Sequence, residues 1–228
     1  MKLSIIVPVF NEKKTIAKIL QKVHEQDLND WEKEIIVVDD GSSDGTEEIL
    51  IKLKERFYFI LLWHSKNLGK GAAIKTALKY TTGDFVLIQD ADLEYDPNDY
   101  QNLLNALGKN SPVIYGSRNL GSAKRGYFLY FLGGRLLTAF LNIMFGSSLT
   151  DINTGYKLFQ TDIIKNINLE TDGFEFCEEV TAKILKSGYH IKEVPIHYYP
   201  RKFSQGKKLR FRDGLIGFWT IIKFKIRL

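Results

Sequence analysis

The run Phe85-Val-Leu-Ile-Gln-Asp-Ala-Asp-Leu-Glu94 decides the fold expected for this chain. Its first half is short and apolar, which is typical of a buried strand. Asp90, Asp92 and Glu94 follow, and burying an ionised carboxylate without a partner costs several kcal/mol or more. We therefore expect these acids at the mouth of the strand, in water or against a cation. Two interpretations stay open at this point: a site for a hard divalent cation, which prefers oxygen ligands, or an acidic turn.

Similar apolar runs recur along the first half of the chain and alternate with amphipathic stretches. The pattern predicts strands at residues 3–9, 34–38, 57–63, 85–89 and 113–116. It predicts helices at residues 13–26, at 72–80, from 97 onward, and after an expected capping box at Asp44-Gly-Thr-Glu47. Apolar strands that alternate with helices predict an α/β fold, with a parallel sheet covered by helices on both faces.

Polar residues follow the ends of four of these strands. In open α/β sheets, ligands bind beyond the carboxyl ends of the strands. That rule places the following segments along one edge of the sheet: residues 10–12, 39–40, 67–70 and 90–94. Their convergence on one crevice is stronger evidence for a binding site than any one segment alone.

The second half of the chain differs in character. Residues 127–145 are rich in Phe, Tyr and Leu, and a polar loop is expected at Asp151-Ile-Asn-Thr-Gly-Tyr-Lys157. A helix is predicted at residues 174–187 and a last strand at 191–196, followed by a basic stretch at 201–212. Residues 127–145 and 215–228 each fit a membrane-interface segment or an ordinary core helix. For residues 215–228 we favour the membrane, because a tail end has little chain left to pack against.

The composition narrows the classes of partner. A chain of 228 residues with 44% hydrophobic residues can form one domain with a sizeable core. Its net charge of +5 is compatible with phosphate-bearing partners or an anionic membrane surface. The single cysteine, Cys177, excludes an internal disulfide and suits a reducing compartment. We expect no signal peptide, no spanning helix of ~18 apolar residues and no nucleic-acid partner, because the basic tail has the pattern of an amphipathic helix.

Three further groups of residues point to phosphate or nucleotide binding. Asn67-Leu-Gly-Lys-Gly71 opens a helix, where backbone amides and Lys70 favour an anion, although the segment also fits a glycine turn. Asp39 is suited to accept a hydrogen bond from a base or a ribose hydroxyl. Arg201 and the Lys207-Lys208 pair fit either a diphosphate clamp or a solvated basic loop. A nicotinamide cofactor is not expected, because the Gly-x-Gly-x-x-Gly pattern is missing.

A set of motifs, each loose by itself, occurs in a specific order. They are Val7-Pro-Val-Phe-Asn-Glu12, Val38-Asp-Asp-Gly-Ser-Ser-Asp44, Asn67-Leu-Gly-Lys-Gly71, Gln89-Asp-Ala-Asp-Leu-Glu-Tyr-Asp-Pro97, Gly116-Ser-Arg118 and Asp151-Ile-Asn-Thr-Gly-Tyr-Lys157. With them the chain resembles family 2 glycosyltransferases of the glycosyltransferase A fold, from about Leu3 to Lys208. Within that family it resembles the dolichyl-phosphate mannose synthase branch, which includes polyprenyl-phosphate glycosyltransferases. The resemblance implies a Rossmann-like, mostly parallel sheet flanked by helices, with amphipathic helices in the C-terminal half.

The resemblance also implies roles for individual residues. Mg²⁺ or Mn²⁺ would be held by Asp90, Asp92 and Glu94; relatives often have Gln at the last position, which leaves the metal preference open. The nucleotide-sugar would be bound by Pro8, Phe10, Asn11, Glu12, Asp39, Asp90 and Arg201. Lys70 and Lys207 join this set because of their places in the chain, at a helix start and after the last strand, and not because of the resemblance. The acceptor phosphate would be bound by Ser117, Arg118 and Arg135, and the catalytic set would be Asp90, Asp92, Arg118 and Arg135. Asp151 and Glu179 fall at typical positions without an assigned role.

The implied activity is the inverting, metal-dependent transfer of a sugar from a nucleotide-sugar, of the GDP-mannose or UDP-glucose type, to a dolichyl or undecaprenyl phosphate. We expect a catalytic domain at residues 1–208 and a basic amphipathic helix at 209–228. The protein would lie peripherally on the cytoplasmic face of a membrane; its protein partners and oligomeric state are open. One alternative is a transferase for a soluble or glycan acceptor. The other is a non-catalytic nucleotide-sugar-binding module, and only this second one is disfavoured by the intact acids Asp39, Asp90 and Asp92.

Overall fold

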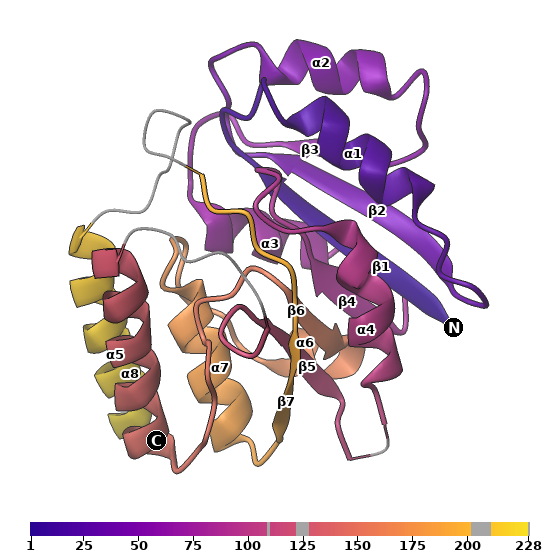
Figure 1. Ribbon diagram of the computed structural model, residues 1–228. Coiled ribbons are helices and arrows are strands. Elements are labelled where there is room, and N and C mark those ends of the chain that lie inside the picture. Colours follow the sequence, from indigo (N-terminus) through magenta and orange to yellow (C-terminus); the bar gives the residue numbers. More distant parts are fainter. Residues whose placement is uncertain (109, 122–127, 202–210, 228) are drawn as a thin grey trace.

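A seven-stranded sheet forms the centre of the molecule, in the strand order β3-β2-β1-β4-β6-β5-β7 (Figure 1). The computed structural model describes residues 1–108, 110–121, 128–201 and 211–227. The strands are β1 Lys2–Val9, β2 Glu32–Asp39, β3 Ile60–Trp63, β4 Phe85–Ile88, β5 Val113–Ser117, β6 Lys157–Gln160 and β7 Ile191–Pro195. The helices are α1 Ile16–Glu25, α2 Thr46–Leu53, α3 Lys70–Leu78, α4 Tyr100–Asn105, α5 Phe128–Phe145, α6 Thr161–Asn166, α7 Phe176–Lys186 and α8 Phe211–Ile226, with a 3₁₀ turn η1 at Pro97–Asp99.

The predicted mostly parallel α/β sheet is confirmed. Strand β1 pairs in parallel with β2 and with β4, where Leu3 lies opposite Phe85 and Ile6 opposite Ile88. The exception is β6, which is antiparallel to both β4 and β5. The sequence prediction missed this strand and ended its polar loop at Lys157, because the strand is short and begins with a lysine.

The core lies in two layers because both faces of the sheet are covered. Alternate side chains of β1 point to opposite faces: Ile5 packs in the cluster that includes α1, α2 and α4, and Ile6 packs in the cluster that includes α3, α6 and α7. Figure 1 shows the helices on the two sides of the sheet. This double burial explains why these strands are apolar throughout.

Helices α5 and α8 lie side by side at one end of the molecule (Figure 1). A third cluster joins them: Leu141 and Ile221 are buried, and the rings of Phe140 and Phe218 are 5.1 Å apart. The reason given for a membrane role of the tail is therefore wrong, because α8 does pack, against α5 and α7. Among the described residues, no helix is both long and apolar enough to span a bilayer.

The expected capping box at Asp44 is also wrong. Helix α2 begins at Thr46, after Gly45 in a left-handed conformation with φ 94°. Oδ1 of Asp44 accepts a hydrogen bond from the Thr46 amide at 3.0 Å, and Oδ2 accepts one from the Lys13 amide at 3.1 Å. Asp44 thus ties the start of α2 to the loop after β1, because its carboxylate has two oxygens to share.

Candidate active site

The predicted site segments meet at the carboxyl ends of β1, β2 and β4. The strand order reverses between β1 and β4, since the chain runs outward from β1 to β3 and then returns to β4. Such a switch point is the usual ligand crevice of an open α/β sheet. Residues 10–12, 39–40 and 90–94 lie at or just beyond the ends of these strands, as the sequence predicted.

The ends of β1 and β2 are tied together by a turn. The Asn11 amide donates to Oγ of Ser42, and the Ser43 amide donates to Oδ1 of Asn11, both at 2.8 Å. Oδ1 of Asp39 accepts from the Ser42 amide at 3.1 Å. Beside this turn lies a hollow of about 440 Å³, lined by Asp39, Gly41, Ser42, Glu47, Trp63, His64 and Ser65. Asp39 thus lines this hollow. Pro8, which was also predicted to bind the nucleotide-sugar, lies on β1, opposite Val38.

Lys70 stands at the first turn of α3, beside the acids. The carboxylate of Asp40 holds the preceding loop, because it accepts from the amides of Leu68 and Gly69 at 2.9 and 2.8 Å. Gly69 has a φ of 108°, and a side chain there would collide with the backbone of Asp172. Nζ of Lys70 forms an ion pair with Oδ1 of Asp90, so the predicted anion-binding lysine faces a carboxylate.

Arg201 lies among three acids that come from distant parts of the chain. Its Nη1 is 3.1 Å from both carboxylate oxygens of Glu12, and its Nη2 is 2.8 Å from Oδ2 of Asp92. Its Nε is 3.6 Å from Oε1 of Glu94 and is buried with no hydrogen-bond partner among the residues that the structure describes. The structure therefore brings together four residues that the sequence assigned to the nucleotide-sugar and the metal.

The acids Asp90 and Asp92 fit a hard divalent cation. Burial first, and then the neighbouring Asp90 carboxylate, raises the pKa of Asp92 to about 7, although Arg201 acts in the opposite direction. A cation beside Asp92 would favour its charged form. Mg²⁺ is usually bound by one or two carboxylates together with water and substrate phosphates. The two aspartates supply such a donor set without a cage of protein ligands.

Glu94 is held by the protein instead. Its Oε2 accepts from the Tyr198 hydroxyl at 2.7 Å, and its Oε1 accepts from the Arg201 amide at 2.8 Å. Within the described ranges, no group of three His, Cys, Asp or Glu side chains is placed to hold a metal ion. Both oxygens of Glu94 are thus engaged, as are those of Asp92, which accept from the Glu94 amide at 3.0 Å and from Nη2 of Arg201 at 2.8 Å. Binding of a cation by Asp90, Asp92 and Glu94 stays a prediction.

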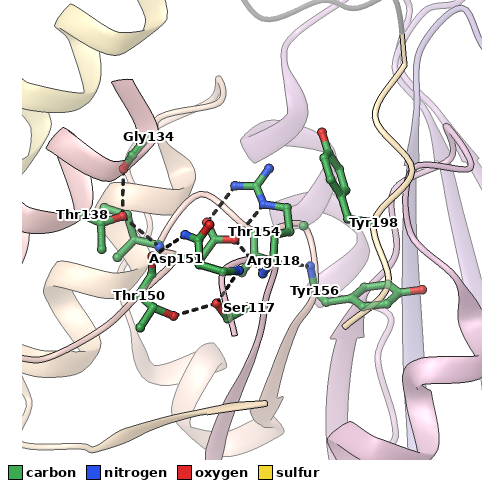
Figure 2. A network of polar contacts seen from close by, with 12 residues as sticks. Ser117, Arg118, Gly134, Thr138, Thr150, Asp151, Thr154, Tyr156 and Tyr198 are labelled. Carbon is green, nitrogen blue, oxygen red and sulfur yellow. Dashed lines mark hydrogen bonds and ion pairs between the residues drawn. The ribbon is translucent and has the colours of Figure 1, made fainter. Parts of the chain in front are cut away.

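On the other side of the crevice, Arg118 pairs with Asp151 (Figure 2). Nε and Nη2 of Arg118 each lie 2.7 Å from an oxygen of Asp151, and the Arg118 amide donates to the same carboxylate at 3.1 Å. Burial lowers the pKa of the Arg118 guanidinium, but Asp151 outweighs burial and the pKa is raised. Ser117 is buried, and its Oγ lies 2.6 Å from Oγ1 of Thr150. Asp151, which had no assigned role, thus orients the arginine predicted for the acceptor phosphate.

The loop that carries Asp151 is held from beneath by Lys157, which the sequence analysis missed. Nζ of Lys157 donates to the carbonyls of Ile152 and Thr154 at 2.8 and 2.6 Å, and the side chain is buried. Burial lowers the pKa of Lys157. The one sign in the sequence that Lys157 has a structural role was its place at the end of the Asp151-to-Lys157 motif, close to loop carbonyls that need hydrogen-bond donors.

The remaining predicted residues have different surroundings. Arg135 is exposed on α5, with its guanidinium 5.8 Å from the Phe131 ring centre. Thr138, on the same helix, reaches the Asp151 loop: its Oγ1 accepts from the Ile152 amide at 3.4 Å and donates to the Gly134 carbonyl within α5 (Figure 2). Glu179 accepts from the amides of Glu170 and Thr171, so it fixes a loop. Lys207 and Lys208 lie outside the described residues.

Known proteins resemble this chain in sequence and in structure. A low-salt glycan biosynthesis hexosyltransferase of Haloferax volcanii is 29% identical over 98% of the chain, which spans only 53% of that relative. A dolichyl-phosphate beta-glucosyltransferase of Trichomonas vaginalis is 30% identical over 98% of the chain and 73% of its own length. A dolichol-phosphate mannosyltransferase of Pyrococcus furiosus is 26% identical over 91% of the chain and 59% of its own length.

The fold has a solved counterpart. Glucosyl-3-phosphoglycerate synthase from Mycobacterium tuberculosis, in complex with Mn²⁺, uridine diphosphate and phosphoglyceric acid, matches with a TM-score of 0.77 at 19% identity. The match covers 99% of this chain and 78% of that one, which supports the glycosyltransferase A fold. The model of glycosyl transferase family 2 matches residues 4–167. With the crevice, its acids and its arginines in place, the chain belongs to glycosyl transferase family 2.

Proposed function

We propose that this glycosyltransferase moves a sugar from a nucleoside diphosphate sugar onto the phosphate of a polyprenyl lipid, at a membrane surface and with inversion. The relatives named for dolichyl-phosphate or dolichol-phosphate transfer support this acceptor class. The proposal divides the crevice into a donor side, around Asp39, Asp90, Asp92 and Arg201, and an acceptor side, around Arg118 and Asp151.

The observation that carries the lipid acceptor is the double role of α5. Through Thr138, whose Oγ1 accepts from the Ile152 amide at 3.4 Å, this helix is joined to the Asp151 loop. The same helix exposes Leu132, Leu136 and Ile143, and its neighbour α8 exposes Leu215, Trp219 and Ile226. Apolar side chains grouped on paired helices are typical of a surface that contacts another molecule or a membrane. A lipid phosphate at Arg118 would then have its chain beside an apolar surface.

On the donor side, Asp39 would bind the nucleoside at the hollow and Arg201 would bind the diphosphate. An arginine suits this role because its planar guanidinium can contact two phosphate oxygens at once. When bound at Asp90 and Asp92, Mg²⁺ or Mn²⁺ would act as a Lewis acid and offset the negative charge of the diphosphate. Lys70, now paired with Asp90, would add positive charge on the same side.

On the acceptor side, Arg118 would neutralise the acceptor phosphate and hold it in line with the anomeric carbon. Asp151 fixes the guanidinium through Nε and Nη2, and within the described part of the chain no hydrogen bond is made by Nη1, which could then bind a ligand. Arg135 would approach the phosphate from α5. Positive charge here offsets the repulsion between two phosphate-bearing substrates.

The reaction needs no strong general base. An oxygen of the acceptor phosphate, already anionic near neutral pH, forms a bond to the anomeric carbon. The bond from that carbon to the diphosphate breaks, and the nucleoside diphosphate leaves with the electron pair. Direct attack from the opposite face inverts the anomeric centre. Arg201 would stabilise the charge that develops on the leaving group.

A second candidate is transfer to a soluble phosphate acceptor. It is favoured by the solved counterpart, whose structure contains phosphoglyceric acid. The Arg118–Asp151 pair would serve either kind of phosphate, so the choice depends on the surface formed by α5 and α8.

The test is a panel of labelled donors offered to the purified protein. GDP-mannose and UDP-glucose would each be supplied with undecaprenyl phosphate or with 3-phosphoglycerate, in Mn²⁺, in Mg²⁺ and in EDTA. We expect label to enter the organic phase from one donor, only with a divalent cation. Label that stays in the aqueous product supports the soluble acceptor instead. No transfer from any donor contradicts the proposed function.

A further inference from the structure

The segment that follows β7 connects the two sides of the crevice. We call residues 196–201 the strap. It is fixed at both ends and in the middle. The Ile196 amide donates to the Ser117 carbonyl at 3.3 Å, the Tyr199 amide to the Glu94 carbonyl at 2.8 Å, and the Arg201 amide to Oε1 of Glu94 at 2.8 Å. Its last described residue is Arg201, on the donor side.

Tyr198, in the middle of the strap, contacts both sides. The Arg118 guanidinium faces the Tyr198 ring, with Cζ 5.1 Å from the ring centre. Figure 2 shows the two groups next to each other. The Tyr198 hydroxyl donates to Oε2 of Glu94 at 2.7 Å. The other oxygen of Glu94 accepts from the amide of Arg201 at 2.8 Å. Tyr198 thus contacts Arg118 directly through its ring and is linked to Arg201 through its hydroxyl and Glu94.

We propose that Tyr198 is a positioning residue for both substrates: its hydroxyl sets Arg201 through Glu94, and its ring supports Arg118. The proposal rests on the donor and acceptor sides of the proposed function. It also gives Glu94 a role that needs no metal, since this carboxylate joins the Tyr198 hydroxyl to the Arg201 backbone. Transfer requires both arginines to hold their phosphates in line with the sugar, and small displacements cost much of the rate.

The chemistry of the two contacts differs, so they can be separated. The hydroxyl makes a hydrogen bond to a charged group, which is among the stronger kinds in proteins. The ring makes a cation–π contact, which is insensitive to loss of the hydroxyl. The Tyr95 ring also packs against the Tyr198 ring, with 5.4 Å between their centres, so we expect the ring to keep its place without the hydroxyl.

The deciding variant is Tyr198→Phe. UDP and GDP are each titrated calorimetrically in the presence of Mn²⁺, and the wild type shows which nucleotide is preferred. We expect Tyr198→Phe to bind that nucleotide roughly tenfold more weakly. The KM for undecaprenyl phosphate should stay near the wild-type value. Tyr198→Leu, which removes the ring as well, should also raise the KM for undecaprenyl phosphate. Unchanged nucleotide binding in Tyr198→Phe, or equal losses on both sides, would overturn the proposal.

A matched control is Tyr115→Phe. Tyr115 is also buried, and its hydroxyl lies 3.0 Å from Oγ1 of Thr181, a residue that contacts neither arginine in the described structure. This control should change neither nucleotide binding nor the acceptor KM. If Tyr198→Leu does not fold, Tyr198→Phe is combined with Glu94→Ala: the loss of the hydroxyl should add nothing once Glu94 is gone. Additive losses would contradict a path through Glu94.

Failure of the proposed function gives a different result. If the wild type transfers no sugar to undecaprenyl phosphate, the proposed acceptor is wrong, while the UDP and GDP titrations still decide the hydroxyl's role. Inorganic phosphate then replaces the lipid as the probe for the Arg118 side. Weaker phosphate binding in Tyr198→Leu than in Tyr198→Phe supports the ring's role, and equal binding contradicts it.

Discussion

Nη2 of Arg201 lies 2.8 Å from Oδ2 of Asp92, so a guanidinium already neutralises an acid that we propose as a metal ligand. The same guanidinium contacts Glu12 at 3.1 Å. A divalent cation and Arg201 would therefore compete for Asp92 until a diphosphate offers the arginine a new partner. Arg201 would pair with Asp92 and Glu12 before the donor binds, and with the diphosphate afterwards.

Replacing Arg201 should have opposite effects on the two ligands of the donor side. In Arg201→Gln, we expect Mn²⁺ alone to bind several-fold more tightly, because a competing cation is removed. UDP or GDP with Mn²⁺ should bind about tenfold or more weakly, because a charged contact to the diphosphate is lost. Electron paramagnetic resonance of free Mn²⁺ and calorimetry of the nucleotide measure the two effects. Weaker binding of both ligands would show that Arg201 does not compete for Asp92.

Asp92→Ala should abolish transfer and preserve the fold. Loss of a carboxylate that holds the cation removes stabilisation of the leaving diphosphate, which we expect to cost at least ~100-fold in kcat. The thermal unfolding midpoint should change little, because the buried Asp92 charge is itself costly, as its pKa of about 7 indicates. The control is the wild type in EDTA, which should match the variant. Normal turnover by Asp92→Ala would remove this acid from the mechanism.

The acceptor side can be tested through Asp151→Asn. Nε and Nη2 of Arg118 each donate to a different oxygen of Asp151 at 2.7 Å, and an amide would replace one of these acceptors with a donor NH₂ group. The freed guanidinium should lose its orientation, and the acceptor KM should rise by roughly tenfold or more. The donor KM should stay near the wild-type value. A rise in both constants would indicate damage to the shared loop, and Lys157→Met serves as the reference for such damage.

The sequence was informative where one rule of chain geometry applied. Acids after apolar strands had to lie at one edge of a parallel sheet, and Asp39, Asp90 and Asp92 do. The partners of those acids were harder to predict, because Arg201 and Glu12 are separated by 189 residues and meet only through the folded chain. Glu94 shows a second limit: the same carboxylate can bind a metal or a backbone amide, and only its neighbours decide.

The antiparallel strand β6 was missed for a related reason. Lys157 opens it and is fully buried, which a lysine tolerates only when its ammonium finds several acceptors. Those acceptors are carbonyls of the Asp151 loop, so the loop and the strand stabilise one another. A hydrophobicity pattern alone does not show that the carbonyls of a loop will accept hydrogen bonds from a buried lysine.

Two adjacent glutamates on α7 should give opposite pH dependences. Burial raises the pKa of Glu178 from its ordinary 4.5 to about 7. The folded state then holds this proton more tightly than the unfolded chain, so the associated stability is complete below pH 4.5 and is lost as the pH rises past 7. Glu178→Gln should therefore raise the free energy of unfolding at pH 8 by up to about 3 kcal/mol.

Glu179 provides the control for this experiment. Despite burial, hydrogen bonds from Lys183 and Thr171 lower its pKa. Its contribution is present above the ordinary pKa and is lost as the pH falls, so Glu179→Gln should destabilise the protein at pH 8. Urea unfolding of both variants at pH 5 and pH 8 gives the comparison. The same sign of change at pH 8 in the two variants would contradict this assignment.

Membrane contact should depend on the exposed apolar side chains of α5 and α8. Ile143 and Trp219 are 81% and 67% exposed, so their replacement leaves the buried contacts between the helices intact. If both side chains enter the lipid, each contributes about 1.5–3 kcal/mol, and Ile143→Gln with Trp219→Gln should weaken binding to anionic liposomes at least tenfold. This pair tests the surface better than removal of α8, which would expose the core around Ile221. Ile51→Gln with Tyr58→Gln, at exposed positions on and after α2, should leave co-sedimentation unchanged; equal losses in the two pairs, or none in either, would exclude α5 and α8 as the membrane contact.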